Sequence, residues 1–275
     1  MINVLEYIAY QEQIPMSYCY DREAWEGDKD YRMIVTNVFS PSQFWVVSRI
    51  QQHDLFHRYM QYHYNMLEGD SFKLSCYSVP CTEFCVIKTN GSFYRAMLVS
   101  MDLDRRIVRV FLVDYGISTQ VNTDNLYLLF KELRKVPMFA IRATLSDLGP
   151  YESSTWSPDA IEAFRKMVMN KALKCKLKYL DDLNAIVELD ELDEYHDQTG
   201  ERNLIKKTLI DKKFAEPLVD ALEVHDLELR NHLFKQVEAG VDCDPDLSEK
   251  MLKDITASYP YIGEILINNV SIFGN

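Results

Sequence analysis

The sequence predicts an α+β fold that is mainly β, in which a small β-barrel is joined by a linker helix to a second β-rich module. Three observations carry this prediction. Short segments rich in β-branched and aromatic residues follow one another between residues 84 and 122. Apolar residues between 51 and 67 recur at helical spacing instead, and leucines do so again from residue 217 onward. The last pattern predicts a helical C-terminal extension.

Composition and charge exclude several classes of function. The chain has 275 residues, of which 47% are hydrophobic and 26% charged, the profile of a folded globular protein. The 30 basic and 42 acidic residues give a net charge of −12, which argues against direct nucleic-acid binding, because phosphate contacts need clustered lysines and arginines. The same charge favours a basic protein partner. No apolar run is long enough to span a membrane, the N-terminus lacks the pattern of a signal peptide, and no cofactor is predicted.

A β-hairpin and a helix are predicted after a mixed, acidic lead-in over residues 1–30. The hairpin turns at Pro41, between apolar segments over 33–39 and 44–47. The helix is predicted over residues 51–67, because its apolar residues recur at spacings of four, three and four. These residues are Leu55, Tyr59, Tyr62 and Met66.

The segment that follows is predicted to be a compact β-structure. Asn90-Gly91 favours a tight hairpin turn between the first two strands. Strands are predicted over residues 84–88, 93–100, 107–114, 119–122 and 138–145, with a short helix over 124–135.

A second group of elements begins at residue 157. Ser157-Pro158 predicts the N-cap and first residue of a helix that ends near Lys171. Strands are predicted over 174–179, 185–192 and 203–210. From Pro217 the leucine stripe predicts helix, and residues 217–246 hold eight acidic and two basic side chains. This extension, residues 216–275, is expected either to pack on the domain or to mediate self-association.

Two sequence motifs on neighbouring predicted strands are the most informative. Phe93-Tyr94-Arg95-Ala96 opens one strand, and Asp114-Tyr115-Gly116 ends the next. With the hairpin over 35–46 and the strand over 140–143, they resemble an extended Tudor domain, in which a Tudor barrel is inserted in a staphylococcal-nuclease-like OB module. The resemblance covers residues 31–215. It implies a nuclease-like hairpin and linker helix (31–67), a Tudor barrel (72–148) and the remainder of the nuclease-like module (157–215).

The resemblance implies a protein-binding scaffold rather than an enzyme. Members of the family typically read dimethylated arginine in flexible arginine-rich tails, often those of Piwi-clade Argonaute proteins. A methylated guanidinium is a weakly hydrated cation that stacks between aromatic faces. The same resemblance implies a cytoplasmic, perinuclear germ granule (nuage) of the piRNA pathway as the setting, with roles in gametogenesis and transposon silencing.

The family's methylarginine cage is only partly present. It uses four aromatic residues and one asparagine, of which Tyr94 and Tyr115 are retained here. The three other positions correspond to Thr89, Leu112 and Ile117. Each lost aromatic wall forfeits about 0.5–2 kcal/mol of cation–π attraction.

Two further residues complete the predicted peptide-binding set. They are Phe93 and Asp114, each next to a cage tyrosine, and Asp114 is also expected to pair with Arg95 across the barrel. The partial cage favours an unmethylated or non-standard arginine peptide. A conventional reader of symmetric dimethylarginine and a scaffold whose groove is unused are the alternatives.

Enzymatic alternatives are less well supported by the sequence. His53, His57 and His63 have the spacing of a metzincin zinc site, but Met60 stands where the chain should turn. On a continuous helix His63 lies about 240° around from His57, too far to share one metal. The acidic residues at 190–194 suggest a metal-dependent nuclease, although a solvated turn explains them equally well. Neither a catalytic residue nor a metal ligand is therefore predicted.

Overall fold

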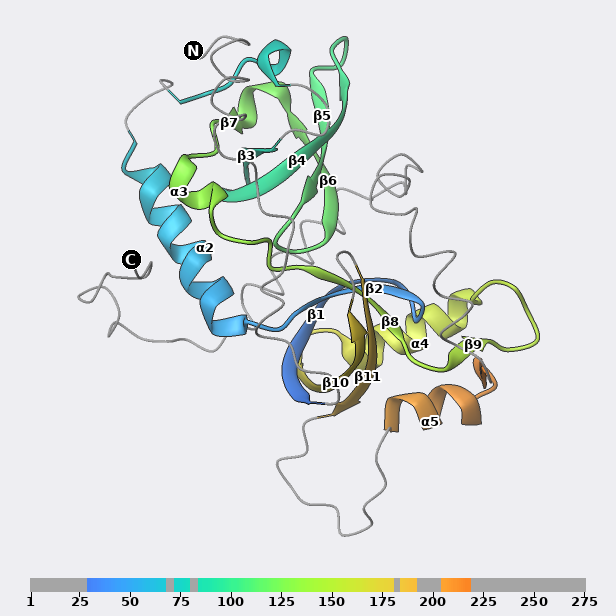
Figure 1. Ribbon diagram of the computed structural model, residues 1–275. Coiled ribbons are helices and arrows are strands. Elements are labelled where there is room, and N and C mark those ends of the chain that lie inside the picture. The colour runs from blue at the N-terminus through green and yellow to red at the C-terminus, as the bar shows by residue number, and fades with distance from the viewer. Residues whose placement is uncertain (1–28, 68–71, 80–83, 181–183, 192–203, 219–275) are drawn as a thin grey trace.

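The computed structural model describes residues 29–67, 72–79, 84–180, 184–191 and 204–218. Two β-rich units are joined by helix α2 and by the connection that leads into strand β8 (Figure 1). The predicted mainly-β fold is confirmed. The predicted lead-in up to residue 28 and the predicted extension beyond Leu218 lie outside the described residues. Within the described part of the chain, no helix is long and apolar enough to cross a membrane.

One unit is a closed five-stranded barrel, called the closed barrel below. Its strands follow the order β1-β10-β11-β8-β2, and only β11 and β8 pair in parallel. Phe44 and Phe164 meet edge to face in its core, with ring centroids 5.2 Å apart. The strands are β1 (Asp30–Ser40), β2 (Gln43–Val47), β8 (Ile141–Leu145), β10 (Ala172–Leu180) and β11 (Asn184–Glu191).

Helix α4 (Pro158–Val168) packs against the closed barrel and supplies Phe164 to its core. It begins where the sequence predicts, because the Ser157 hydroxyl accepts a hydrogen bond from the backbone N–H of Ala160 at 3.2 Å. A two-stranded sheet of β9 (Leu148–Pro150) and β12 (Ala215–Pro217) accompanies this unit.

The other unit is an antiparallel sheet of order β6-β5-β4-β3-β7, called the five-stranded sheet below. The hairpin between its first two strands turns at Asn90 and Gly91, both with positive φ, as the Asn-Gly pair predicts. Its strands are β3 (Phe84–Thr89), β4 (Ser92–Asp102), β5 (Ile107–Leu112), β6 (Ile117–Asn122) and β7 (Leu126–Tyr127), with a 3-10 turn η2 (Cys76–Ser78) before them.

Helix α2 (Ile50–Asn65) lies against the five-stranded sheet, as the predicted linker helix should. The Gln61 side chain fixes it there: Nε2 donates to the carbonyl of Phe93 at 2.6 Å, and Oε1 accepts from the N–H of Phe93 at 2.7 Å. The amide thereby satisfies a stretch of β4 that β5 does not reach. The face that α2 buries carries His53, Asp54, Phe56, Met60 and Tyr64.

The predicted helix over 124–135 is wrong for most of its length. Its first residues form the 3-10 turn η3 (Thr123–Asn125), capped by the Asn122 side chain, and β7 follows. Leu126 and Tyr127 pair with Ile87 and Val86 of β3, and this distant pairing overrides the local helical signal. Only α3 (Lys131–Arg134) is helical.

Two further elements differ from the predictions. The predicted strand over 203–210 is helix α5 (Leu204–Asp211), which buries Ile205 and Leu209 one helical turn apart against the closed barrel. Strand β8, which the sequence analysis groups with residues 72–148, belongs to the closed barrel, because it pairs with β2 and β11.

Candidate functional site

Tyr94 and Tyr115 meet where β4 begins and the chain turns from β5 to β6. Their rings lie edge to face, with centroids 5.5 Å apart and planes at 76°. The turn that presents Tyr115 closes through hydrogen bonds from the N–H groups of Tyr115 and Gly116 to the carbonyl of Leu112, at 3.1 and 2.8 Å. The two motifs found in the sequence therefore come together in space.

Two histidines of α2 cover these tyrosines. The His57 ring lies 5.5 Å from the Tyr94 ring, and His57 Nδ1 is 3.1 Å from the Tyr115 hydroxyl. The His53 ring packs edge-on against Tyr115 at 4.7 Å. Tyr94 and Tyr115 are consequently only 4% and 1% exposed, whereas His57 is half-buried. A ligand reaches the tyrosine faces only if His57 moves.

The other predicted cage positions lie at different depths. Leu112 and Ile117 are 0% and 2% exposed and belong to the apolar core of the five-stranded sheet. Thr89 is half-buried at the β3–β4 hairpin, paired with Ser92. Of these three, Thr89 alone has surface to offer a ligand.

Phe93 points away from Tyr94, since neighbouring residues of a strand face opposite sides. Its ring stacks on Tyr64 with centroids 5.1 Å apart, and the Lys88 ammonium lies 4.9 Å from its centroid. Phe93 therefore helps to hold α2 against the sheet.

Asp114 is engaged within the protein. Arg95 Nε and Nη2 donate to its two carboxylate oxygens at 2.8 and 2.5 Å, and both side chains are buried. The Arg95 guanidinium also lies over the Phe56 ring, 4.4 Å from its centroid. The predicted Arg95–Asp114 pair is confirmed, and it secures the fold around Tyr115.

The turn after Tyr115 also joins the two β-units. Asn37 Nδ2 of β1 donates to the carbonyl of Gly116 at 2.7 Å. The Trp45 ring of β2 packs on Phe111 with centroids 5.0 Å apart. The candidate site thus lies where α2, the five-stranded sheet and the closed barrel meet.

Comparison with known proteins places this geometry in a family. Residues 26–147 match the model of the Tudor domain family. This part of the chain is a Tudor domain. Over 181 residues the chain is 32% identical to human Tudor domain-containing protein 6, an alignment that covers 64% of this chain and 8% of that protein. Human Tudor domain-containing protein 1 is 26% identical over 189 residues, covering 67% of this chain and 15% of the relative. The chain therefore spans a small part of the length of these relatives.

Solved structures show that the fold is that of an extended Tudor domain. A mouse TDRD1 extended Tudor domain, in complex with a MILI peptide that contains dimethylarginine, superposes with a TM-score of 0.59 at 21% identity. The match covers 70% of this chain and 95% of that one. The Drosophila melanogaster Papi extended Tudor domain in complex with a methylated Piwi N-terminal peptide gives 0.56 at 19% identity, covering 69% and 100%. The family predicted from two short motifs is confirmed.

Sequence reasoning missed the part that α2 plays in this Tudor domain site. His53, His57 and Gln61 follow one another at intervals of four, so they share one helix face. That spacing is the signal that could have found them. The sequence analysis considered the histidines only as metal ligands. His63 instead packs on Phe130, with ring centroids 5.0 Å apart, and no group of three metal-ligating side chains occurs among the described residues.

Burial of the two histidines makes the Tudor domain sensitive to acid. Desolvation lowers the pKa of His53 to about 3, partly offset by Asp114, while His57 and Arg95 lower it further. Burial also lowers the pKa of His57. The unfolded chain therefore binds protons at a higher pH than the folded one. Stability is expected to fall as pH drops below about 6.5 towards 3, by up to about 1.4 kcal/mol per pH unit for His53 alone.

The variant His53→Phe tests this expectation. It keeps the ring contacts with Tyr115 and Phe139 and removes the titrating group. Urea unfolding at a series of pH values should give a shallower loss of stability between pH 6 and 4 for the variant. Equal slopes for the two proteins would contradict the assignment.

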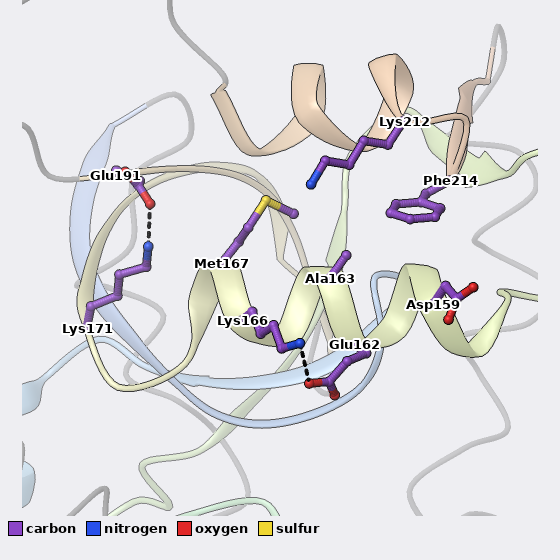
Figure 2. A pocket seen from close by; sticks show the side chains of 9 residues that line it. All are labelled: Asp159, Glu162, Ala163, Lys166, Met167, Lys171, Glu191, Lys212 and Phe214. Atoms are coloured by element: carbon purple, nitrogen blue, oxygen red, sulfur yellow. Dashed lines mark hydrogen bonds and ion pairs between the residues drawn. The ribbon is translucent and has the colours of Figure 1, made fainter.

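A second depression, of about 500 Å³, lies between α4 and α5 on the closed barrel (Figure 2). Ala163, Met167 and Phe214 form its apolar lining. Around it, Lys166 pairs with Glu162 and Lys171 pairs with Glu191. Its three lysines and three carboxylates give no net charge to attract a basic tail, so the tyrosine pair remains the candidate site of the domain.

Proposed function

We propose that this chain is a protein-binding module that takes an arginine-containing tail of a partner at Tyr94 and Tyr115. The observation that carries the proposal is the meeting of three aromatic rings, Tyr94, Tyr115 and His57, at the turn of the Tudor domain. The extended Tudor structures with MILI and Piwi peptides support an arginine tail of a Piwi-type Argonaute as the ligand. The net charge of −12 would attract such a tail over long range.

His57 supplies what the incomplete cage lacks. Leu112 and Ile117 lie in the core, so neither can provide an aromatic wall or an amide acceptor. A neutral imidazole has an aromatic face and, at Nδ1, a lone pair that can accept from a guanidinium N–H. When His57 swings aside from the tyrosines and remains beside the bound cation, it provides both.

The closed arrangement and the short set of walls favour an unmethylated arginine. Opening the site breaks the His57–Tyr115 hydrogen bond, a loss of about 1 kcal/mol. Methyl groups gain mainly from additional aromatic walls, whereas an unmethylated guanidinium keeps five N–H donors for acceptors such as His57 Nδ1 and the tyrosine hydroxyls. The role follows: a scaffold that gathers an arginine-tailed partner in a germline piRNA granule.

Titration with matched arginine–alanine peptides tests the proposal. The unmethylated peptide should bind at least as tightly as the symmetrically dimethylated one. His57→Ala should weaken binding by about three- to tenfold through the loss of one cation–π wall. Tyr115→Phe keeps the ring but frees His57, so it should bind equally or up to about fivefold more tightly.

The control variant is Tyr179→Phe, on a half-exposed tyrosine of β10 away from the site. It should leave all affinities unchanged. A tenfold preference for the dimethylated peptide would contradict the partial-cage argument. Binding of both peptides unaltered by His57→Ala and by Tyr94→Phe would show that the tail binds elsewhere.

A further inference from the structure

Helix α2 has a second apolar face, opposite the one it buries. Leu55, Tyr59, Tyr62 and Met66 lie along it at helical spacing; this set is called the outer stripe below. The sequence alone predicts that such a stripe faces the core. In the structure, however, Tyr62 and Met66 are 67% and 64% exposed, and Leu55 and Tyr59 are half-buried. A helix that is apolar on two opposite faces normally packs on both.

The surroundings of the outer stripe carry no free carboxylate. Asp54 is the one acidic residue of α2, and it is buried and paired with Arg58 at 3.0 Å. The residues that flank the stripe are neutral or basic: Gln51, Gln52, Arg58, His63 and Asn65. In a chain with 42 acidic residues, this face therefore suits an apolar partner with acidic flanks.

The chain itself contains a segment of this chemistry. Leu222, Leu229, Leu233 and Val237 recur at spacings of seven, four and four, within residues 217–246, where acidic side chains outnumber basic ones by eight to two. This segment follows directly on the last described residue, Leu218. Residues 219–228, fully extended, span about 33 Å, roughly the diameter of a small domain.

We propose that the outer stripe of α2 is the docking surface for the acidic leucine stripe 222–237 of the same chain. Leucines on one helix and Tyr59, Tyr62 and Met66 on the other form an apolar seam, and the acidic flanks lie near Arg58 and His63. The two-faced linker helix then joins the Tudor domain on one side and the C-terminal extension on the other. This arrangement is independent of the arginine-tail site.

Hydroxyl-radical footprinting of the full chain tests the docking. The structure offers exposed tyrosines for comparison, Tyr77 and Tyr179, which are 72% and 46% exposed. If the seam forms, Tyr62 should react at least about threefold more slowly than these two, because docked side chains are protected until the segment opens locally. The double variant Leu229→Asp/Leu233→Asp should raise labelling of Tyr62 to the level of Tyr77 and leave Tyr77 and Tyr179 unchanged.

Sedimentation of the same proteins identifies the occupant. The docked chain is expected to be monomeric before and after the leucine substitutions. Labelling of Tyr62 as fast as that of Tyr77 in the unchanged chain would overturn the proposal. So would a dimer that dissociates in the double variant, since a second copy would then cover the outer stripe.

Discussion

Replacing Arg95 by methionine is expected to lower the free energy of unfolding by about 3–5 kcal/mol, because it leaves the buried Asp114 carboxylate without its partner. Arg95 also donates to three backbone carbonyls: Nη1 bonds Leu133 and Val136 at 2.7 and 2.6 Å, and Nη2 bonds Pro137 at 3.1 Å. Those carbonyls lie on the connection into β8. One guanidinium therefore ties the five-stranded sheet to the chain that enters the closed barrel. Urea unfolding of the variant and the unchanged chain measures the loss.

Two further variants separate the buried charge from the loss of an arginine as such. Arg105 is 80% exposed and pairs with Asp102 at 3.6 Å, so Arg105→Met should change stability by less than about 1 kcal/mol. Adding Asp114→Asn to Arg95→Met should recover part of the loss, since a neutral amide keeps an acceptor for the N–H of Phe139. A loss below about 1 kcal/mol for Arg95→Met would show that the pair contributes little to the fold.

The parts of the fold that the sequence predicts correctly have their cause nearby in the chain. Asn90-Gly91 adopts the positive φ values that its turn needs, and Ser157 caps α4 through its own hydroxyl. The errors arise where distant contacts decide. Leu126 and Tyr127 become a strand because β3 offers an edge, and residues 204–211 become a helix because Ile205 and Leu209 meet the closed barrel one turn apart. A short apolar run does not by itself distinguish strand from helix.

The candidate site shows the same division. The motifs locate Tyr94 and Tyr115, and the sequence also predicts the Arg95–Asp114 pair. The motifs do not show that His53 and His57 cover the two tyrosines, because this follows from which face α2 turns to the sheet. Apolar spacing favours the wrong face: the stripe through Tyr62 is exposed, whereas the face with two histidines is buried. Ring contacts and the Gln61 hydrogen bonds to Phe93 outweigh simple hydrophobicity there.

Gly116→Ala is the second change with a large expected effect, a loss of about 2–5 kcal/mol of folding free energy. Gly116 has φ +68°, a conformation that disfavours any Cβ by about 1–2 kcal/mol. A Cβ at this position would also lie 2.1 Å from Cγ of Trp45, so the indole must shift, and such overpacking costs about 1–3 kcal/mol. The shift would disturb the contact of Trp45 with Phe111 and the hydrogen bond from Asn37, both of which join the two β-units.

Gly91→Ala is the matched control for that variant, because Gly91 has φ +77° but nothing lies within 4 Å of a Cβ built there. It should lose only the conformational part, about 1–2 kcal/mol. Combining Gly116→Ala with Trp45→Ala should cost less than the sum of the two single losses, since removal of the indole relieves the clash. Equal losses for the two glycine variants, measured by thermal or urea unfolding, would mean that the close approach of Trp45 contributes nothing. An excess for Gly116→Ala that disappears in the Trp45→Ala background would instead assign the glycine of Asp114-Tyr115-Gly116 to the packing of the two β-units, beside the tyrosine that the proposed arginine site uses.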